Sequence, residues 1–354
     1  MQPLRIAIDL RMVGAIPHGI ARYATALWKG LPARSDVRYL ALVGSAVPPT
    51  LSSQRPGDEL IQTHSRFLSP LEQIEVPALL RRAGAALFHA TSFSVPLAWR
   101  GPLILTLHDL THLRVAEFHD RKRRAYYKWV VAPAARRAKQ ILTVSAFERG
   151  ELQRWLRLPA ERIAMAPDAV EFVPLPQARA DSGARPLLLY VGNGKPHKNV
   201  ELIVEAVQRL EQPAHLLLVG KGLERFRRQA VEVRSHVEDD ELQQLYARAS
   251  LFLFPSRSEG FGLPPLEAAR LGTPVLVADA AALPELWRGV APVLSPTDPE
   301  AWRQQIDLLL SNPRLRQALA ERCARHAEQY VSWAPMLALT ERSYRKALDL
   351  PAVD

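Results

Sequence analysis

The sequence predicts an α/β protein with two Rossmann-like domains that face each other across a deep cleft. Short apolar runs alternate with longer segments of helical period along almost the whole chain, which is the pattern of parallel sheets covered by helices. The alternation stops once, at residues 173–186, and then restarts. The 354 residues are enough for two domains, because one domain typically holds about 150 residues.

Five candidate strands lie in the first half of the chain. They are Arg5–Leu10, Arg38–Val43, Ala86–His89, Leu103–His108 and Gln140–Val144. Helical periodicity predicts three helices between them, at Ile20–Leu31, Leu71–Arg82 and Arg121–Arg137. Pro77 and Pro133 fall inside the second and third of these helices, so we expect both helices to be kinked or shortened.

The interruption at residues 173–186 has the composition of a linker, with three prolines, one glycine and no periodicity. We therefore expect an N-terminal domain at residues 1–172 and a C-terminal domain at residues 187–331. Residues 332–354 form a further helical segment.

The same alternation in the second half of the chain predicts four more strands. They are Leu187–Val191, His215–Val219, Leu251–Phe254 and Pro274–Val277. The predicted helices are Val200–Leu210, Asp239–Ala249, Pro264–Leu271 and two segments beyond Asp298. In sheets of this kind ligands bind outside the carboxyl ends of the strands, so chemical motifs should stand directly after strands.

The composition excludes several classes of protein. No stretch approaches the roughly 20 continuous apolar residues of a membrane span, and the first residues read as a strand without a cleavable signal. Cys323 is the only cysteine, which excludes a disulfide framework and a Cys-cluster zinc site. The net charge of +10 attracts phosphate-rich partners, but it does not choose among nucleic acid, anionic membrane and phosphorylated substrate.

The most informative segment, Pro255–Pro274, begins where a predicted strand ends. Gly260 and Gly262 allow the backbone to approach a ligand closely, and the helix start that follows attracts an anion such as a diphosphate. Glu259 in the loop and Glu267 on the helix could both bind the paired hydroxyls of a ribose or a hexose. On spacing alone, two solvated carboxylates at a helix start explain the pattern equally well.

This segment resembles the Glu-x7-Glu signature of the retaining nucleotide-sugar glycosyltransferases of GT-B architecture, the family-4 type that includes many bacterial mannosyltransferases. The surrounding Pro255-Ser256 and Gly272-Thr273-Pro274 match as well. The resemblance implies that Glu267 holds the ribose of the donor and that Glu259 holds the transferred sugar. It also implies a donor-binding role for the residues between them: Gly260, Phe261, Gly262 and Leu263.

A second glycine loop, Gly192-Asn193-Gly194-Lys195-Pro196-His197-Lys198, follows the strand Leu187–Val191. A lysine there can neutralise a diphosphate leaving group as charge develops on it, although by itself the pattern fits a surface lysine. The resemblance to the family's Lys-Asn site assigns that catalytic role to Lys198 and brings Gly192 and Asn193 into the donor site. The family adds an arginine in this loop, and either Lys195 or His197 takes its place here.

In the first half, Leu107-His108-Asp109 ends a strand and resembles the family's His-Asp site near the transferred sugar. The resemblance makes His108 a catalytic residue, whereas a buried histidine bonded to the backbone is the structural alternative. The loop Gly14–Gly19 resembles the first loop of the family, which approaches acceptor and donor, and this implies a donor contact at Gly19.

Other segments resemble the family in the expected order. Val237–Leu242 resembles the segment that packs on the nucleotide base, which places Val237 in the donor site, although an acidic helix start explains it equally well. Met165–Val170 shapes the cleft in the family, and Asp168-Ala169 here replaces the family's Asn-Gly. The stretch Ser332–Leu348 resembles the closing helix that returns to the first domain.

One basic region carries aromatic residues. Its cations are Arg121, Lys122, Arg123, Arg124, Lys128, Arg136, Arg137 and Lys139, and its aromatic residues are Tyr126, Tyr127 and Trp129. Such a helix could lie on an anionic bilayer and bring an enzyme to a lipid-linked acceptor. A solvated helix with its aromatic residues turned to the core is the competing interpretation.

The resemblance as a whole implies a retaining glycosyltransferase of surface-polysaccharide (lipopolysaccharide O-antigen) biosynthesis. It would move mannose or rhamnose from a nucleotide diphosphate sugar, such as GDP-mannose, to a saccharide or polyprenyl-linked acceptor, with the first domain on the acceptor side. We expect no cofactor beyond this co-substrate and no metal, because no carboxylate cluster in the sequence suggests a metal site. We expect the protein in the cytoplasm, with a peripheral contact to the inner face of the plasma membrane.

Two other functions are weighed against this one. A nucleotide-sugar epimerase of similar architecture would convert the donor without any acceptor. A basic nucleic-acid-binding protein would bind with an affinity that falls steeply with salt, but no recognition-helix, zinc-finger or RNA-binding signature supports it.

Overall fold

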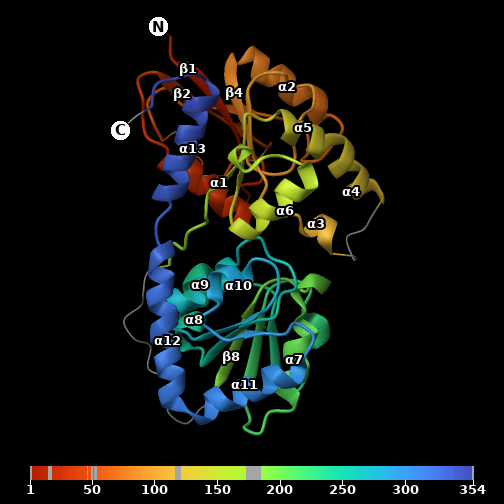
Figure 1. Cartoon of the computed structure of the whole chain (residues 1–354), viewed down its shortest axis with the longest axis vertical. Helices are drawn as coiled ribbons and strands as arrows, with labels where there is room; N and C mark the ends of the chain where they lie inside the picture. Colours follow the sequence, from red (N-terminus) through yellow and green to blue (C-terminus); the bar gives the residue numbers. More distant parts are fainter. Residues whose placement is uncertain are drawn as a thin grey trace. The chain divides into compact units, whose positions relative to one another are not determined.

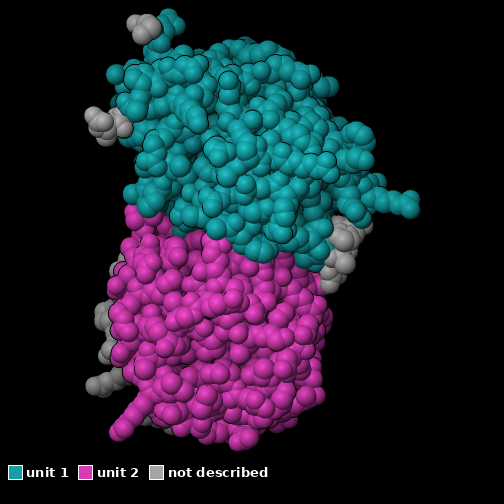
Figure 2. Space-filling view, in the orientation of Figure 1, with its two compact units in different colours: residues 1–168, 333–354 teal, residues 169–332 magenta. Residues whose placement is uncertain are grey.

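The computed structural model describes residues 2–14, 18–45, 47–48, 51, 54–115, 121–172 and 185–352. The chain folds into two compact units (Figure 2). Unit 1 comprises residues 1–168 and 333–354, and unit 2 comprises residues 169–332. Most of the linker expected at residues 173–186, and residues 15–17 of the first loop, lie outside the described residues.

Unit 1 is built on one parallel sheet (Figure 1). Within the described residues its seven strands run, in spatial order, β3 (Glu59–Gln62), β2 (Val37–Val43), β1 (Leu4–Asp9), β4 (Ala85–Ala90), β5 (Leu103–Thr106), β6 (Gln140–Thr143) and β7 (Ile163–Met165). The order reverses between β1 and β4. That position is the topological switch point, where a crevice forms at the carboxyl ends of the strands.

Helices cover both faces of this sheet. They are α1 (Gly19–Gly30), α2 (Glu72–Arg82), α3 (Thr111–Arg114), α4 (Arg121–Tyr126), the π-helical turn η3 (Tyr127–Val131), α5 (Ala132–Arg137), α6 (Ala146–Leu156) and α13 (Ala334–Ala347). Ile6 and Ile8 of β1 pack in one core with α1 and α13, whereas Ala7 packs in the other core with α2, α5 and α6. This alternation follows from the two-residue period of a strand.

Unit 2 repeats the same topology. Within the described residues its parallel sheet has the order β10 (Val231–Arg234), β9 (His215–Val219), β8 (Leu187–Val191), β11 (Leu251–Phe254), β12 (Val275–Ala278) and β13 (Val293–Leu294). Its helical elements are the short turn η5 (Pro196–Lys198), α7 (Val200–Gln208), α8 (Asp239–Arg248), α9 (Leu263–Arg270), α10 (Leu283–Trp287), α11 (Pro299–Ser311) and α12 (Pro313–Ala327). Here the switch point lies between β8 and β11.

These two sheets confirm the predicted fold class, and every strand expected from the sequence is present. The helix expected at Arg121–Arg137 is interrupted by η3, directly before Pro133. Four short strands were not predicted: β3, β7, β10 and β13. Among the described helices, none has the length and the apolar character that a membrane crossing requires.

Candidate active site

Two predicted site residues meet at the switch point of unit 2. Lys198 ends the turn that follows β8, and Glu259 lies in the loop that follows β11. The Lys198 Nζ atom lies 2.7 Å from Glu259 Oε1. Both side chains are largely buried, with 16% and 14% of their surface exposed. The structure therefore brings together a cation and a carboxylate that stand 61 residues apart in the chain.

Asn199 holds the loop of Lys198 against the loop of Glu259. Its side-chain Nδ2 donates to the carbonyl oxygen of Pro255 at 3.1 Å and to that of Pro296 at 2.9 Å. Asn199 itself has a φ of 57°, a left-handed conformation that asparagine adopts more readily than most residues. A second link runs from the Arg257 backbone N–H to the His197 carbonyl at 2.8 Å. The two loops that carry Lys198 and Glu259 are thus tied together directly.

The first glycine loop packs against a second one at backbone distance. The Gly194 N–H donates to the Lys221 carbonyl at 2.8 Å, and a Cβ atom on Gly194 would lie 1.9 Å from the Gly222 oxygen. Gly220 has a φ of 139°, and a Cβ there would lie 2.0 Å from the Gly192 oxygen. Only glycine fits these positions, because backbone atoms cannot yield as a flexible side chain can.

Arg225 supports the same loop, and the sequence analysis did not single it out for that role. Its guanidinium donates to the Gly194 carbonyl at 3.0 Å, to the Gly222 carbonyl at 3.2 Å and to Glu201 at 2.8 Å. Nothing in the local sequence signals this contact, because Arg225 lies 31 residues from Gly194. Arg225 is a positioning residue of the glycine loop.

The segment Gly260–Gly262 offers backbone N–H groups to a ligand. No hydrogen bond of the described chain uses the N–H groups of Gly260, Phe261 or Gly262, although all three residues are buried. Gly262 has a φ of 102° and precedes α9, whose first turn contains Pro264 and Pro265. Because proline lacks an N–H, the first turn of α9 has fewer free N–H groups than the sequence suggested, whereas the loop before it has three.

Glu267 lies on α9 and is 4% exposed. The hydroxyl of Tyr246 on α8 donates to Glu267 Oε2 at 3.0 Å. This bond holds one carboxylate oxygen in a fixed place. Tyr246 was not identified from the sequence, because its role depends on how α8 and α9 pack.

The remaining predicted donor residues of unit 2 differ in exposure. Asn193 Oδ1 accepts from the Lys195 backbone N–H at 3.2 Å, which makes the tight turn of the loop. The residue Lys195 is exposed, whereas His197 is 8% exposed. Val237 is 9% exposed and directly precedes Glu238, the N-cap of α8.

In unit 1, β5 ends at Thr106, so His108 lies two residues beyond the strand and not at its end as predicted. Its Nε2 atom lies 3.0 Å from the Thr91 carbonyl, and its ring stands edge-on to Tyr23 with the centroids 4.8 Å apart. Since a carbonyl oxygen only accepts, Nε2 carries the proton. In the neutral ring, Nδ1 is then left as an acceptor. Burial lowers the pKa of His108 to about 4, so the imidazole is neutral at pH 7.

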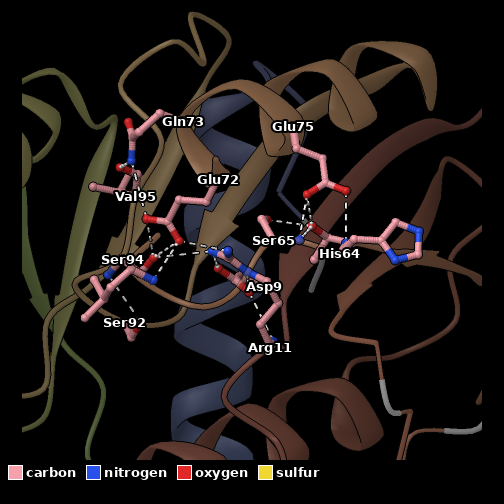
Figure 3. A network of polar contacts seen from close by, with 12 residues as sticks. Asp9, Arg11, His64, Ser65, Glu72, Gln73, Glu75, Ser92, Ser94 and Val95 are labelled. Carbon is pink, nitrogen blue, oxygen red and sulfur yellow. Dashed lines mark hydrogen bonds and ion pairs between the residues drawn. The ribbon is translucent and has the colours of Figure 1, made fainter. Parts of the chain in front are cut away.

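A buried ionic network anchors the loop after β1 (Figure 3). The guanidinium of Arg11 donates to both carboxylate oxygens of Asp9, at 2.9 and 2.7 Å, and to Glu72 Oε2 at 2.9 Å. Ser94 donates to both oxygens of Glu72. Burial acts to lower the pKa of Arg11, but the two carboxylates outweigh it and raise that pKa above its usual value.

This network continues toward His108. The hydroxyl of Thr91 donates to the Asp9 carbonyl, and the Thr91 carbonyl accepts from His108. His18 caps α1 by accepting from the Ala21 N–H at 3.3 Å, so Gly19 stands in the first turn of that helix. The charged core of unit 1 therefore positions both His108 and the strand end beside it.

Within the described residues, no group of three or more histidine, cysteine, aspartate or glutamate side chains is placed to hold a metal ion. The candidate site of unit 2 contains instead a lysine, two carboxylates and several backbone N–H groups. Such an arrangement binds anions and hydroxyl groups, which are the chemical parts of a nucleotide diphosphate sugar.

Two family models match the chain. Residues 17–172 match "Glycosyltransferase Family 4", and residues 185–312 match "Glycosyl transferases group 1". The chain is 29% identical to the O-antigen chain mannosyltransferase B of Escherichia coli, over 92% of this chain and 96% of that protein.

Solved structures share the fold. The sucrose-phosphate synthase of Thermosynechococcus elongatus superposes with a TM-score of 0.79 at 18% identity, covering 98% of this chain and 99% of that one. The Anabaena protein Alr3699/HepE, solved in complex with UDP-glucose, superposes with a TM-score of 0.73 at 18% identity, covering 96% of this chain and all of that one.

Proposed function

The chain is a glycosyltransferase of the GT-B fold, with a family 4 domain followed by a group 1 domain, and we propose that it transfers mannose or rhamnose with retention of the anomeric configuration. The proposed donor is a nucleotide diphosphate sugar, GDP-mannose or a related compound. The similarity to an O-antigen mannosyltransferase over almost the whole chain supports both the sugar and the role in surface-polysaccharide synthesis.

The observation that carries the proposal is the Lys198–Glu259 pair beside the loop Gly260–Gly262. At 2.7 Å the lysine is paired with a carboxylate, and a diphosphate can replace that carboxylate as its partner. The N–H groups of the loop would bind further phosphate oxygens. Glu259, once released from the lysine, is then placed to accept hydrogen bonds from sugar hydroxyls.

The reaction would proceed mainly by electrostatic stabilisation of the departing diphosphate. The carbon–oxygen bond between the sugar and the diphosphate breaks, and Lys198 neutralises the charge that develops on the leaving oxygen. The acceptor hydroxyl forms the new carbon–oxygen bond on the same face of the sugar, and its proton passes to the departing diphosphate. Glu267 would hold the ribose with the carboxylate that Tyr246 orients. His108, neutral and with a free acceptor at Nδ1, would contact the transferred sugar, as the family resemblance implies.

The acceptor in this proposal is a saccharide or a polyprenyl-linked saccharide. The exposed basic residues of α4 and η3, together with Trp129, support a peripheral contact with the anionic inner face of the plasma membrane, whereas Tyr127 is buried in the core. Trp129 is 65% exposed, which favours an interfacial role over a core position for this aromatic residue.

A thermal-shift screen of nucleotide sugars tests the donor assignment. A ligand that binds only the folded state raises the melting temperature, by an amount that grows with its concentration above Kd. We expect GDP-mannose or a related donor to stabilise the protein more than the free nucleoside. Equal shifts with nucleosides and nucleotide sugars would contradict a diphosphate site.

Product analysis separates transfer from epimerisation. We expect the donor to stay chemically unchanged until a saccharide acceptor is added, and then to release nucleoside diphosphate. Conversion of the donor to an isomeric nucleotide sugar without an acceptor would support the epimerase instead.

A further inference from the structure

Unit 1 contains a second candidate site, a pocket of about 720 Å³ between helices. Its walls come from α3, α4, η3, α5 and α6. The lining residues are Leu113, Arg124, Ala125, Tyr127, Lys128, Trp129, Ala132, Pro133, Arg136 and Trp155. The volume lies within the roughly 300–1,000 Å³ of small-molecule sites. The pocket is lined by helices rather than by the loops after strands, and none of its lining residues belongs to the proposed donor site.

The inner part of the pocket is apolar. Tyr127 is only 1% exposed, and its ring stacks on Phe93 with the centroids 5.6 Å apart. Trp155 packs against the same tyrosine, with the centroids 5.8 Å apart. The Tyr127 hydroxyl is hydrogen-bonded to His112 at 3.1 Å, so no buried polar group of that ring faces the pocket unpaired. This lining suits a hydrocarbon chain.

The outer part of the pocket is cationic. Its three charged lining residues, Arg124, Lys128 and Arg136, are all positive and all exposed. The Lys128 Nζ lies 4.8 Å from the ring centroid of Trp129. This contact holds a cation beside an exposed aromatic ring without neutralising its charge. Cations around an apolar pocket match a ligand that has an anionic head and an apolar chain.

The backbone gives this pocket its shape. Pro133 cannot donate to the carbonyl of Trp129, and the helix makes a π turn there, in which the Ala132 N–H reaches back to the Tyr127 carbonyl. Such turns in helices are frequent at functional sites. The turn places Lys128 and Trp129 on the surface while Tyr127 and Val131 point into the core.

We propose that this pocket binds the lipid phosphate of the acceptor: the apolar chain lies along Leu113 and Trp155, and Arg124, Lys128 and Arg136 bind the phosphate. The inference rests on the proposed function, because it identifies the acceptor as a lipid-phosphate-linked saccharide. It differs from a general membrane contact, since one chain and one phosphate occupy a defined pocket.

Direct binding of a monomeric probe tests this proposal. Decyl phosphate, kept below its critical micelle concentration, is titrated into the full-length protein without any nucleotide and followed by calorimetry. We expect saturable binding at one site, and binding of decanol or inorganic phosphate at least tenfold weaker. Because no donor is present, the result stands whether or not the chain transfers mannose, so failure of the two proposals can be told apart.

Variants locate the site. We expect Lys128→Gln and Arg136→Gln each to weaken decyl phosphate binding about five- to tenfold, as loss of one partly exposed charged hydrogen bond would. Trp155→Ala should weaken the binding of decyl phosphate and of decanol alike, because it removes a wall of the apolar part. Arg121→Gln, at an exposed basic residue of the same helix outside the pocket, is the matched control and should bind as the unchanged protein does. Arg136→Lys keeps the charge and should restore most of the affinity.

Three results would overturn the proposal. The first is equal affinity for decyl phosphate and decanol, and the second is an unchanged affinity in the Lys128→Gln, Arg136→Gln double variant. The third is binding to vesicles of anionic phospholipid without any binding of monomeric decyl phosphate, which would make this region a membrane-contact surface rather than a pocket for one lipid. Near-ultraviolet circular dichroism of each variant verifies that it is folded.

Discussion

Lys198 has one partner in the structure that a ligand can replace. Its Nζ atom is bonded to Glu259 and lies 5.6 Å from the ring centroid of Phe254, so it is held at the switch point with little freedom. A preorganised cation of this kind needs no rearrangement when charge develops on a leaving group. This is the physical reason for assigning it to the diphosphate.

Lys198→Ala should weaken the binding of a nucleoside diphosphate by at least about tenfold, because a hydrogen bond to a charged group is worth about 1.5–3 kcal/mol. Isothermal titration calorimetry measures the effect. Arg209→Ala is the matched control, since Arg209 forms an exposed ion pair with Glu205 on α7. An unchanged Kd in the Lys198 variant would remove this residue from the site.

Asp168 stands where the family has the asparagine of its Asn-Gly pair. Its buried carboxyl group lowers the stability of the folded protein near neutral pH. The carboxyl is 7% exposed, its Oδ1 has no hydrogen-bond partner, and burial raises its pKa to about 7. The folded state therefore keeps a proton that the unfolded chain loses above about pH 4. Stability falls as the pH rises from about 4 to 7.

Asp168→Asn should remove this loss. We expect the variant to raise the melting temperature more at pH 8 than at pH 4.5, because the amide has no proton to lose. Asp349→Asn, at an exposed carboxyl group of the same unit, should show no such pH dependence. A constant difference across this pH range would mean that Asp168 is already ionised in the folded protein.

Two buried histidines of unit 1 change the stability with pH in the direction opposite to that of Asp168. Burial lowers the pKa of His89 to about 3 and that of His108 to about 4. The unfolded chain takes up these protons near pH 6.5, whereas the folded chain resists them. Stability is therefore lost as the pH falls from about 6.5 toward 4.

His89→Gln should reduce the loss of stability that occurs as the pH falls from about 6.5 toward 4. His89 bonds Tyr344 at 2.6 Å and Thr106 at 2.8 Å, so the variant will be less stable at pH 7. The informative quantity is the difference in unfolding free energy between pH 7 and pH 4.5, from urea titrations. It should be smaller than in the unchanged protein, and an equal difference would contradict this role of His89.

At the scale of elements, the glycine loop after β8 depends on backbone contact. Gly194→Ala would place a Cβ atom 1.9 Å from the Gly222 oxygen, so one of the two loops must move. We expect a drop of several degrees in melting temperature, as a ΔΔG of 1–2 kcal/mol produces, together with loss of nucleotide binding. Gly44→Ala, with no atom within 4 Å of its added Cβ, should be neutral. A Gly194 variant with normal donor affinity would contradict the loop's role.

The elements that the sequence predicted well are the buried ones. Strands such as β5 and β11 are continuous apolar runs, and both are fully buried. The missed strands carry weaker patterns: β3 is largely exposed, and β10 alternates buried with half-buried residues at the edge of its sheet. Edge strands lack a second neighbour, so their sequences need not be apolar throughout.

Spacing alone left Glu259 and Lys198 open, and the resemblance to the family selected them. The structure places them 2.7 Å apart, in the loops that follow β11 and β8. Tyr246, Arg225 and Thr91 act through contacts with distant residues, which no local pattern records. The buried carboxylates of the Arg11 network likewise appear only when β1, α2 and the loop after β4 come together (Figure 3).

At the scale of the whole molecule, the net charge of +10 separates into different roles. Many arginines are structural: Arg11 pairs with Asp9 and Glu72, and Arg55 pairs with Asp58 and donates to two carbonyls at the end of α1. Other cations gather at the helical pocket of unit 1 and at the glycine loop of unit 2. If both proposals hold, these two groups of cations each bind a phosphate group, one on the acceptor and one on the donor.

The most direct test of the central claim is a transfer assay with the isolated protein, a nucleotide sugar and a lipid-linked saccharide acceptor, read out by nuclear magnetic resonance of the new glycosidic bond. We predict a product with the anomeric configuration of the donor, and a rate reduced roughly 100- to 1,000-fold by Glu259→Gln. Glu205→Gln, which changes a surface carboxylate of the same unit, should leave the rate unchanged. A product of inverted configuration, or a Glu259→Gln protein of undiminished rate, would contradict the account.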